Sequence, residues 1–175
     1  MGLFFKMTGA LCVMGAAGYF ACSVNQTREL RKKELRKLYS ILLQLKSEIQ
    51  YMNHSLPDCF ERLANGTGEP FQTWFMGMLH LLENKENILF ADVWMEGTKT
   101  LLTHSALETE DVEPLYDLAD KLGTSDISAQ LKAIDYALIH LERNRTALEM
   151  DLEQKKKVTL TLSLFCGAMT LIILL

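Results

Sequence analysis

The last fifty residues of the chain, 126–175, read DISAQLKAIDYALIHLERNRTALEMDLEQKKKVTLTLSLFCGAMTLIILL. They begin with an amphipathic stretch, continue through three consecutive lysines, and end in a segment, residues 158–175, that has no charged side chain. No proline or glycine interrupts the run before Gly167. We predict one long helix that leaves a helical domain and enters a membrane.

The amphipathic part carries apolar residues at alternating spacings of three and four, which place them on one helix face. These residues are Ile127, Leu131, Ile134, Leu138, Leu141, Leu148 and Leu152. Arg145 interrupts the series, and we interpret it as the point where this face leaves the core. The uncharged segment that follows would span roughly 27 Å, close to the hydrocarbon thickness of a bilayer. A buried core helix is the alternative, but the lysines directly before the segment favour a membrane anchor.

Composition and charge narrow the class of protein. The chain has 175 residues, of which 49% are hydrophobic and only 3 are proline, and this favours helix. Residues 28–37 hold 6 basic and 2 acidic side chains, whereas residues 38–154 hold 8 basic and 20 acidic ones. An acidic body argues against nucleic-acid binding. Basic segments beside both apolar ends suit the headgroups of anionic membrane lipids.

The N-terminal segment, residues 4–24, is apolar apart from Lys6, Thr8 and Ser23. A cleaved signal peptide would have this length, but the strongly basic residues that follow oppose export. A lipoprotein signal at Cys22 is disfavoured by the aromatic residues just before it. We therefore predict a transmembrane helix at 4–24, a cytoplasmic helical bundle at 27–154, and a basic flank with a second transmembrane helix at 155–175.

The basic residues that flank the predicted spans lie almost entirely on the side of the central domain. The positive-inside rule therefore places that domain in the cytoplasm and both termini toward the far face of the cell membrane. The cations that we expect at the membrane surface are Arg28, Arg31, Lys32, Lys33, Lys155, Lys156 and Lys157. Small side chains form a stripe along each span, so the spans can pair within one chain or between the chains of a homo-oligomer.

The central segment predicts five helices before the long final one, with no strand-like alternation. Their expected starts are near Thr27, Ser55, Pro70, Lys85 and Glu110. Ser55 is an expected N-cap, as is Ser125 or Asp126, and Gly123 is an expected helix end. Pro114 leaves open whether the fifth helix starts later. The predicted fold is all-α, a six-helix cytoplasmic bundle between two transmembrane helices, with the last helix continuous with the C-terminal one.

Residues typical of catalysis, cofactor binding or metal binding are not arranged together in the sequence. The four histidines lie in separate segments, and the four cysteines form no close pair. The sequence has neither a glycine-rich phosphate loop nor a nucleophile motif. We therefore predict no catalytic, cofactor or metal site, and a protein that is not an enzyme. One acidic group either favours a helix N-terminus or docks a basic partner; it consists of Glu108, Glu110, Asp111 and Glu113.

Two groups of residues resemble a known family. The first comprises Glu48-Ile49-x-Tyr51, Leu56-Pro57 and Phe60-x-x-Leu63-Ala64. The second comprises Leu118-Ala119-x-x-Leu122-Gly123, Ser125-Asp126 and Gln130-Leu131. Together with the order of anchor, helical domain and anchor, they resemble the stage III sporulation protein AB family, and Trp94 lies about where that family has an aromatic residue.

This resemblance implies a membrane protein on the mother-cell side in endospore-forming bacteria, with a helical domain similar to those of the type II secretion platform protein. It also implies a place in the channel complex between mother cell and forespore. The implied partners are the cytoplasmic ATPase of that complex and its other membrane subunits. From the residues alone, a charged helical domain held at the membrane by both ends is a coupling or scaffold component. A membrane-anchored adaptor of unrelated ancestry is the alternative, and two spans are too few for an ordinary transporter.

Overall fold

The computed structural model describes residues 26–52, 55–84, 88–123 and 126–174. Within these ranges the chain is helical and contains no strand. The N-terminal helix covers residues 26–52 and ends in a π-helical turn, η1, at Glu48–Met52. It is followed by α2 (Leu56–Gly66), α3 (Phe71–Asn84), α4 (Phe90–His104), α5 (Thr109–Leu122) and α6 (Ile127–Leu174). The all-α prediction is confirmed for this part of the chain.

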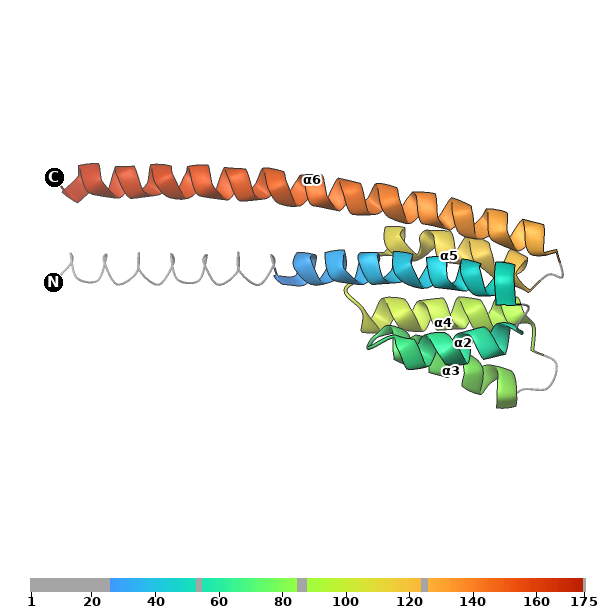
Figure 1. The fold of residues 1–175 in the computed structure, drawn as a ribbon. Coiled ribbons are helices and arrows are strands. Elements are labelled where there is room, and N and C mark those ends of the chain that lie inside the picture. Colours follow the sequence, from blue (N-terminus) through green and yellow to red (C-terminus); the bar gives the residue numbers. More distant parts are fainter. Residues whose placement is uncertain (1–25, 53–54, 85–87, 124–125, 175) are drawn as a thin grey trace.

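The helices pack in the order in which they follow one another. From α2 to α6, each helix packs against the next. The N-terminal helix lies beside α6, so the first and last described helices are neighbours (Figure 1). The helix α6 continues without a break from the bundle through residues 155–157 to Leu174. Figure 1 shows its C-terminal part, drawn in red, extending beyond the other labelled helices.

The predicted membrane anchors fall largely on residues that the structure does not describe. Within the described residues, no helix is both long enough and apolar enough to cross a bilayer. The span predicted at 4–24 lies outside those residues, as do the side chains of residues 159–174. Both anchors therefore stay predictions.

The predicted apolar faces form the core, with two differences in α6. The buried residues of these faces are Leu35, Leu38, Leu42, Leu45 and Ile49 in the N-terminal helix, and Ile134, Leu138, Leu141 and Leu148 in α6. Ile127, expected on this face, is 47% exposed, because it lies in the first turn of α6, beyond the end of α5. Leu148 is buried, so the expectation that the face leaves the core at Arg145 is wrong. Arg145 instead pairs with Glu142 on the same helix.

Two of the predicted caps are observed. Ser55 precedes α2, and its hydroxyl oxygen accepts a hydrogen bond from the backbone N–H of Asp58 at 3.5 Å. Asp126 precedes α6, and its Oδ1 accepts from the backbone N–H groups of Ser128 at 2.9 Å and Ala129 at 3.3 Å. These bonds satisfy N–H groups that have no partner within their own helix.

The start of α4 and the backbone conformation of Gly123 differ from what the sequence suggests. The helix α4 begins at Phe90 rather than near Lys85, because Leu89 has an extended backbone with φ −73° and ψ 136°. Gly123 is the C-cap of α5 as expected, but its φ of −76° is right-handed, unlike the left-handed glycine common at helix ends. A Cβ at Gly123 would lie 3.2 Å from the Cβ of Phe90. Glycine at this position therefore allows the start of α4 to pack closely against the end of α5.

An aromatic cluster holds α2, α3 and α4 together. Its rings belong to Phe60, Phe71, Trp74, Phe75, Phe90 and Trp94. Trp94 contacts the rings of Phe60, Trp74 and Phe90 and is fully buried. Its Nε1 donates a hydrogen bond to the backbone carbonyl of Leu115 on α5 at 2.6 Å. This bond links the cluster to the half of the bundle that contains α5 and α6.

Gly97 of α4 packs directly against side chains of α3. A Cβ there would lie 2.6 Å from Cγ and 2.8 Å from Sδ of Met78, and 3.1 Å from Nε1 of Trp74. Both neighbours are buried, so they cannot move aside into solvent. We expect Gly97→Ala to lower the free energy of unfolding by about 1–3 kcal/mol through overpacking, despite the better helix propensity of alanine. Urea denaturation of the purified variant measures this change.

The matched control is Gly77→Ala on α3, where an added Cβ meets no atom within 4 Å. That change should leave the stability equal or raise it by up to about 1 kcal/mol. Equal effects of the two substitutions would show that the contact at Gly97 is not tight.

Candidate functional site

Arg31 lies on the face of the N-terminal helix that buries Leu35 and Leu38 one and two turns later. A charge on that face needs a partner inside the protein. The partner is Asp111, in the first turn of α5, whose side chain is fully buried. Nε of Arg31 donates to Oδ2 of Asp111 at 2.7 Å, and its second nitrogen, Nη2, donates to Oδ1 at 2.9 Å. This two-bond geometry is a strong form of the arginine–carboxylate pair.

Asp111 accepts hydrogen bonds from the N-terminal helix, from the N-cap of α5 and from α6. Its Oδ2 also accepts the backbone N–H of Glu108 at 2.9 Å, and its Oδ1 accepts from Nδ2 of Asn144 on α6 at 3.4 Å. The carboxylate of Glu108 lies 2.7 Å from Nη1 of Arg31. The hydrogen bond to Asp111 raises the pKa of Arg31, so the guanidinium stays charged. We call these four residues the charged junction.

Pro114 explains why Asn144 belongs to the junction. Proline has no backbone N–H, so within α5 it leaves the carbonyl of Glu110, four residues earlier, without its helical partner. Nδ2 of Asn144 donates to that carbonyl at 2.7 Å. This bond takes the place of the missing one. The helix α5 begins at Thr109 with Pro114 inside it, so the proline does not delay its start.

Ion pairs also link the N-terminal helix to α6 along their common length. The pairs are Arg28–Asp151 at 2.9 Å, Lys32–Glu149 at 3.4 Å, Arg36–Glu149 at 2.8 Å and Lys46–Asp135 at 2.5 Å. All are partly exposed, and such pairs contribute roughly 0–1 kcal/mol each. They define how the two helices align more than they stabilise the fold.

These pairs predict a decline of stability in acid. The pKa of Glu149 is lowered mainly by its hydrogen bond to Arg36, and the pKa of Asp151 mainly by its hydrogen bond to Lys155. Because the folded-state pKa of each carboxylate is lowered, its ionised form stabilises the fold at pH values above its ordinary pKa, which is 4.5 for Glu149 and 3.8 for Asp151. This stabilisation is lost as the pH falls through the folded-state pKa. We expect the free energy of unfolding to fall below about pH 4, and to fall less in Glu149→Gln. Urea titrations of both proteins at several pH values measure this, and parallel pH profiles would contradict it.

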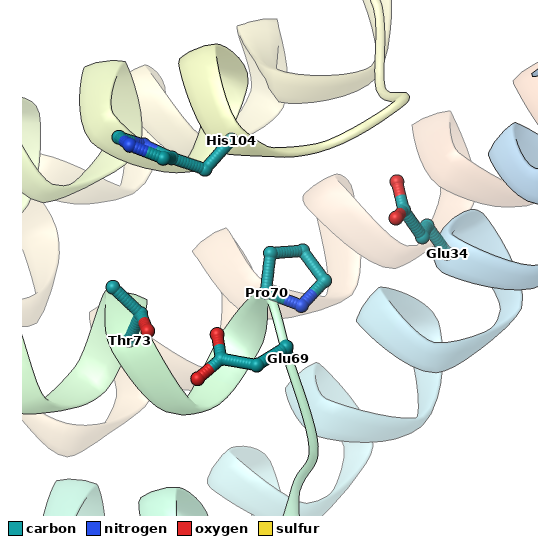
Figure 2. A pocket seen from close by; sticks show the side chains of 5 residues that line it. All are labelled: Glu34, Glu69, Pro70, Thr73 and His104. Carbon is teal, nitrogen blue, oxygen red and sulfur yellow. The ribbon is translucent and has the colours of Figure 1, made fainter.

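An open hollow of about 340 Å³ lies where the N-terminal helix, α3 and the end of α4 meet (Figure 2). It is lined by Glu34, Glu69, Pro70, Thr73 and His104. Two carboxylates and an imidazole are ligands that metals accept, but no three such side chains among the described residues are arranged to hold an ion. Glu34 already accepts the backbone N–H of Ala106 at 2.6 Å, and burial raises its pKa. We therefore assign no ligand to this hollow.

Comparison with protein families decides the ancestry of the chain. The family model described as stage III sporulation protein AB matches residues 6–175. The chain belongs to the stage III sporulation protein AB family. A solved structure, "Stage III sporulation protein AB (SpoIIIAB)", is similar in fold with a TM-score of 0.63 and 25% identity, over 71% of this chain and 97% of that chain. No curated protein matches the sequence. The resemblance noted from the residues is confirmed.

In this member of the stage III sporulation protein AB family, the four carboxylates predicted to dock a partner have different environments. Asp111 is buried, and Glu108 pairs with Arg31, so both act within the chain. Glu110 and Glu113 are exposed. Binding of a basic partner at this group stays a prediction, and these two side chains are the ones positioned to make it.

The cations predicted at the membrane surface also have different environments. Those engaged within the chain are Arg28, Arg31 and Lys32. Lys155 is bonded to Asp151 and remains 53% exposed. Lys33 is exposed and makes no ion pair with the described side chains, whereas the side chains of Lys156 and Lys157 lie outside the described residues. Contact of this set with anionic lipid stays a prediction.

Sequence reasoning missed the internal role of Arg31, although a signal for it was present. Arg31 precedes Leu35 by four residues and Leu38 by seven, so it shares their helix face. A charge that continues an apolar face predicts a buried partner. The sequence held no comparable signal for Asn144, because the donor that replaces a missing bond in α5 lies on another helix.

Proposed function

We propose that this chain is a non-enzymatic membrane component of the channel complex between mother cell and forespore, and that it couples a cytoplasmic ATPase to the membrane subunits of that complex. The observation that carries the proposal is the match of residues 6–175 to the stage III sporulation protein AB family. In the proposal, residues 4–24 and 158–175 cross the mother-cell membrane, and the helical bundle lies in the cytoplasm.

The arrangement of the long helices supports a mechanical role. The helix α6 has no break between the bundle and Leu174, and four ion pairs align the N-terminal helix with it. The charged junction ties both helices to α5 through Asp111. A displacement applied to the bundle would therefore reach both long helices together, because packed helices joined by hydrogen bonds and ion pairs transmit movement.

Anionic lipid would complete the arrangement at the membrane boundary. Lys33 lies about two turns into the N-terminal helix, and residues 155–157 follow the point where Asp151 of α6 pairs with Arg28. Juxtamembrane lysines contribute about 1 kcal/mol each near an anionic leaflet. This contribution would hold the bundle at a defined distance from the membrane.

The test is co-purification of the full-length chain, embedded in lipid nanodiscs, with the cytoplasmic ATPase of the complex. We expect the ATPase to elute with the loaded nanodiscs and not with nanodiscs that carry an unrelated two-span protein. An ATPase that elutes alone, although it still binds other membrane subunits of the complex, would contradict the proposed coupling.

A further inference from the structure

The end of the bundle opposite the C-terminal end of α6 exposes large apolar side chains. Tyr51 in η1, Leu89 before α4 and Ile127 at the start of α6 are 74%, 70% and 47% exposed. Tyr51 and Leu89 have the highest exposed fractions among the large apolar side chains of the described residues. We call these three side chains the distal surface.

Contacts between the elements place the three residues at one end of the molecule. The turn η1 packs against α6. Phe90, the neighbour of Leu89, approaches Gly123, and α6 starts only four residues after that glycine. Figure 1 shows the start of α6 and the end of the N-terminal helix at the same end of the bundle, away from the C-terminal end of α6.

Carboxylates border the distal surface. Asp92 in the first turn of α4 and Asp120 in the last turn of α5 are exposed and form no ion pair with the described side chains. Asp126 caps α6 beside Ile127 and is also exposed. Two exposed lysines, Lys121 and Lys132, also lie near these helix ends. Among these described residues, the border therefore holds three carboxylates and two lysines.

We propose that the distal surface docks a protein partner whose own surface presents apolar side chains inside a border of lysine or arginine. Stable interfaces combine an apolar centre with a polar rim, and an exposed tyrosine is a frequent energetic anchor. A symmetric contact between two copies would bring the acidic borders together, which weakens binding, so the partner is a different protein. This inference rests on the proposed function, which supplies the partner for the test.

The experiment measures binding of the complex's ATPase to the full-length chain in nanodiscs. The distal variant combines Tyr51→Ser, Leu89→Ser and Ile127→Ser. A matched control replaces three exposed apolar side chains elsewhere on α6 and combines Tyr136→Ser, Ile139→Ser and Met150→Ser, whose native side chains are 51%, 53% and 59% exposed. We expect the distal variant to raise Kd at least about tenfold and the control to change it less than about twofold. Equal melting temperatures of variant and wild type establish that the fold is intact.

A second variant tests the acidic border. Asp92→Lys combined with Asp120→Lys should slow association and reduce its dependence on salt. Glu61→Lys on α2, also an exposed carboxylate, should leave both unchanged.

The outcomes separate this inference from the proposed function. Wild-type binding with an unchanged distal variant would overturn the docking surface and leave the ATPase partnership standing. Absence of wild-type binding would overturn the proposed function, and the inference with it. Self-association of the wild-type chain that the distal variant abolishes would also overturn the inference, because the occupant would then be a second copy.

Discussion

Replacing Arg31 with methionine is expected to lower the free energy of unfolding by about 3–5 kcal/mol. Methionine keeps much of the apolar packing of the side chain, but it removes both guanidinium bonds to the fully buried carboxylate of Asp111. Loss of one partner from a buried ion pair is destabilising because the remaining charge stays out of water. Urea denaturation followed by circular dichroism measures the change.

Two comparisons isolate the buried pair. Arg36→Met removes a cation whose side chain is 54% exposed and which pairs with Glu149, and it should change the stability by roughly 0–1 kcal/mol. The double variant Arg31→Met with Asp111→Leu should recover part of the loss, since it leaves no unpaired buried charge. If Arg31→Met were no more destabilising than Arg36→Met, the charged junction would not hold the three helices together.

Replacing Trp94 with alanine is expected to lower the free energy of unfolding by about 3–5 kcal/mol. The side chain is fully buried, and its ring centroid lies 5.3 Å from the ring centroid of Trp74 and 5.9 Å from that of Phe60. The cavity left by the indole would open between helices that are already packed around it. Thermal and urea unfolding of the variant measure the loss.

Trp94→Phe separates packing from hydrogen bonding at the same position. Phenylalanine keeps a ring in the aromatic cluster but removes the Nε1 donor to the carbonyl of Leu115. We expect a smaller loss of about 1–3 kcal/mol, as for a buried acceptor left without its partner. Met95→Ala on the same helix, where the native side chain is 36% exposed, should be nearly neutral. Equal losses for Trp94→Phe and Trp94→Ala would show that the hydrogen bond, and not the ring packing, dominates.

Helix type and the buried faces could be predicted because they depend on local chemistry. In the N-terminal helix, leucines that recur three and four residues apart share one helix face. The leucines of that series, Leu35, Leu38, Leu42 and Leu45, are all buried. Ser55 and Asp126 mark helix starts because their side chains bond backbone groups only two or three residues away. The start of α4 was harder to place, since no side-chain cap precedes Phe90.

The candidate site could be predicted only in part, because it depends on contacts between distant segments. Carboxylates near the start of a helix look alike in sequence, yet Asp111 is fully buried while Glu110 and Glu113 are exposed. Which of them turns inward depends on the element that packs against the start of α5, and that element is the N-terminal helix, eighty residues earlier. The hydrogen bond from Asn144 of α6 to the Glu110 carbonyl, which Pro114 leaves without a helical partner, also joins distant segments.

The most direct test of the membrane arrangement, on which the coupling role depends, is cysteine labelling. Glu61→Cys places a thiol on the exposed side of α2, and the wild-type chain, whose Cys59 is buried, provides the background. A membrane-impermeant maleimide should label the variant in inverted vesicles and leave it unlabelled in intact cells. Labelling from outside intact cells, or recovery of the full-length chain in a detergent-free soluble fraction, would contradict a cytoplasmic bundle held by two membrane anchors.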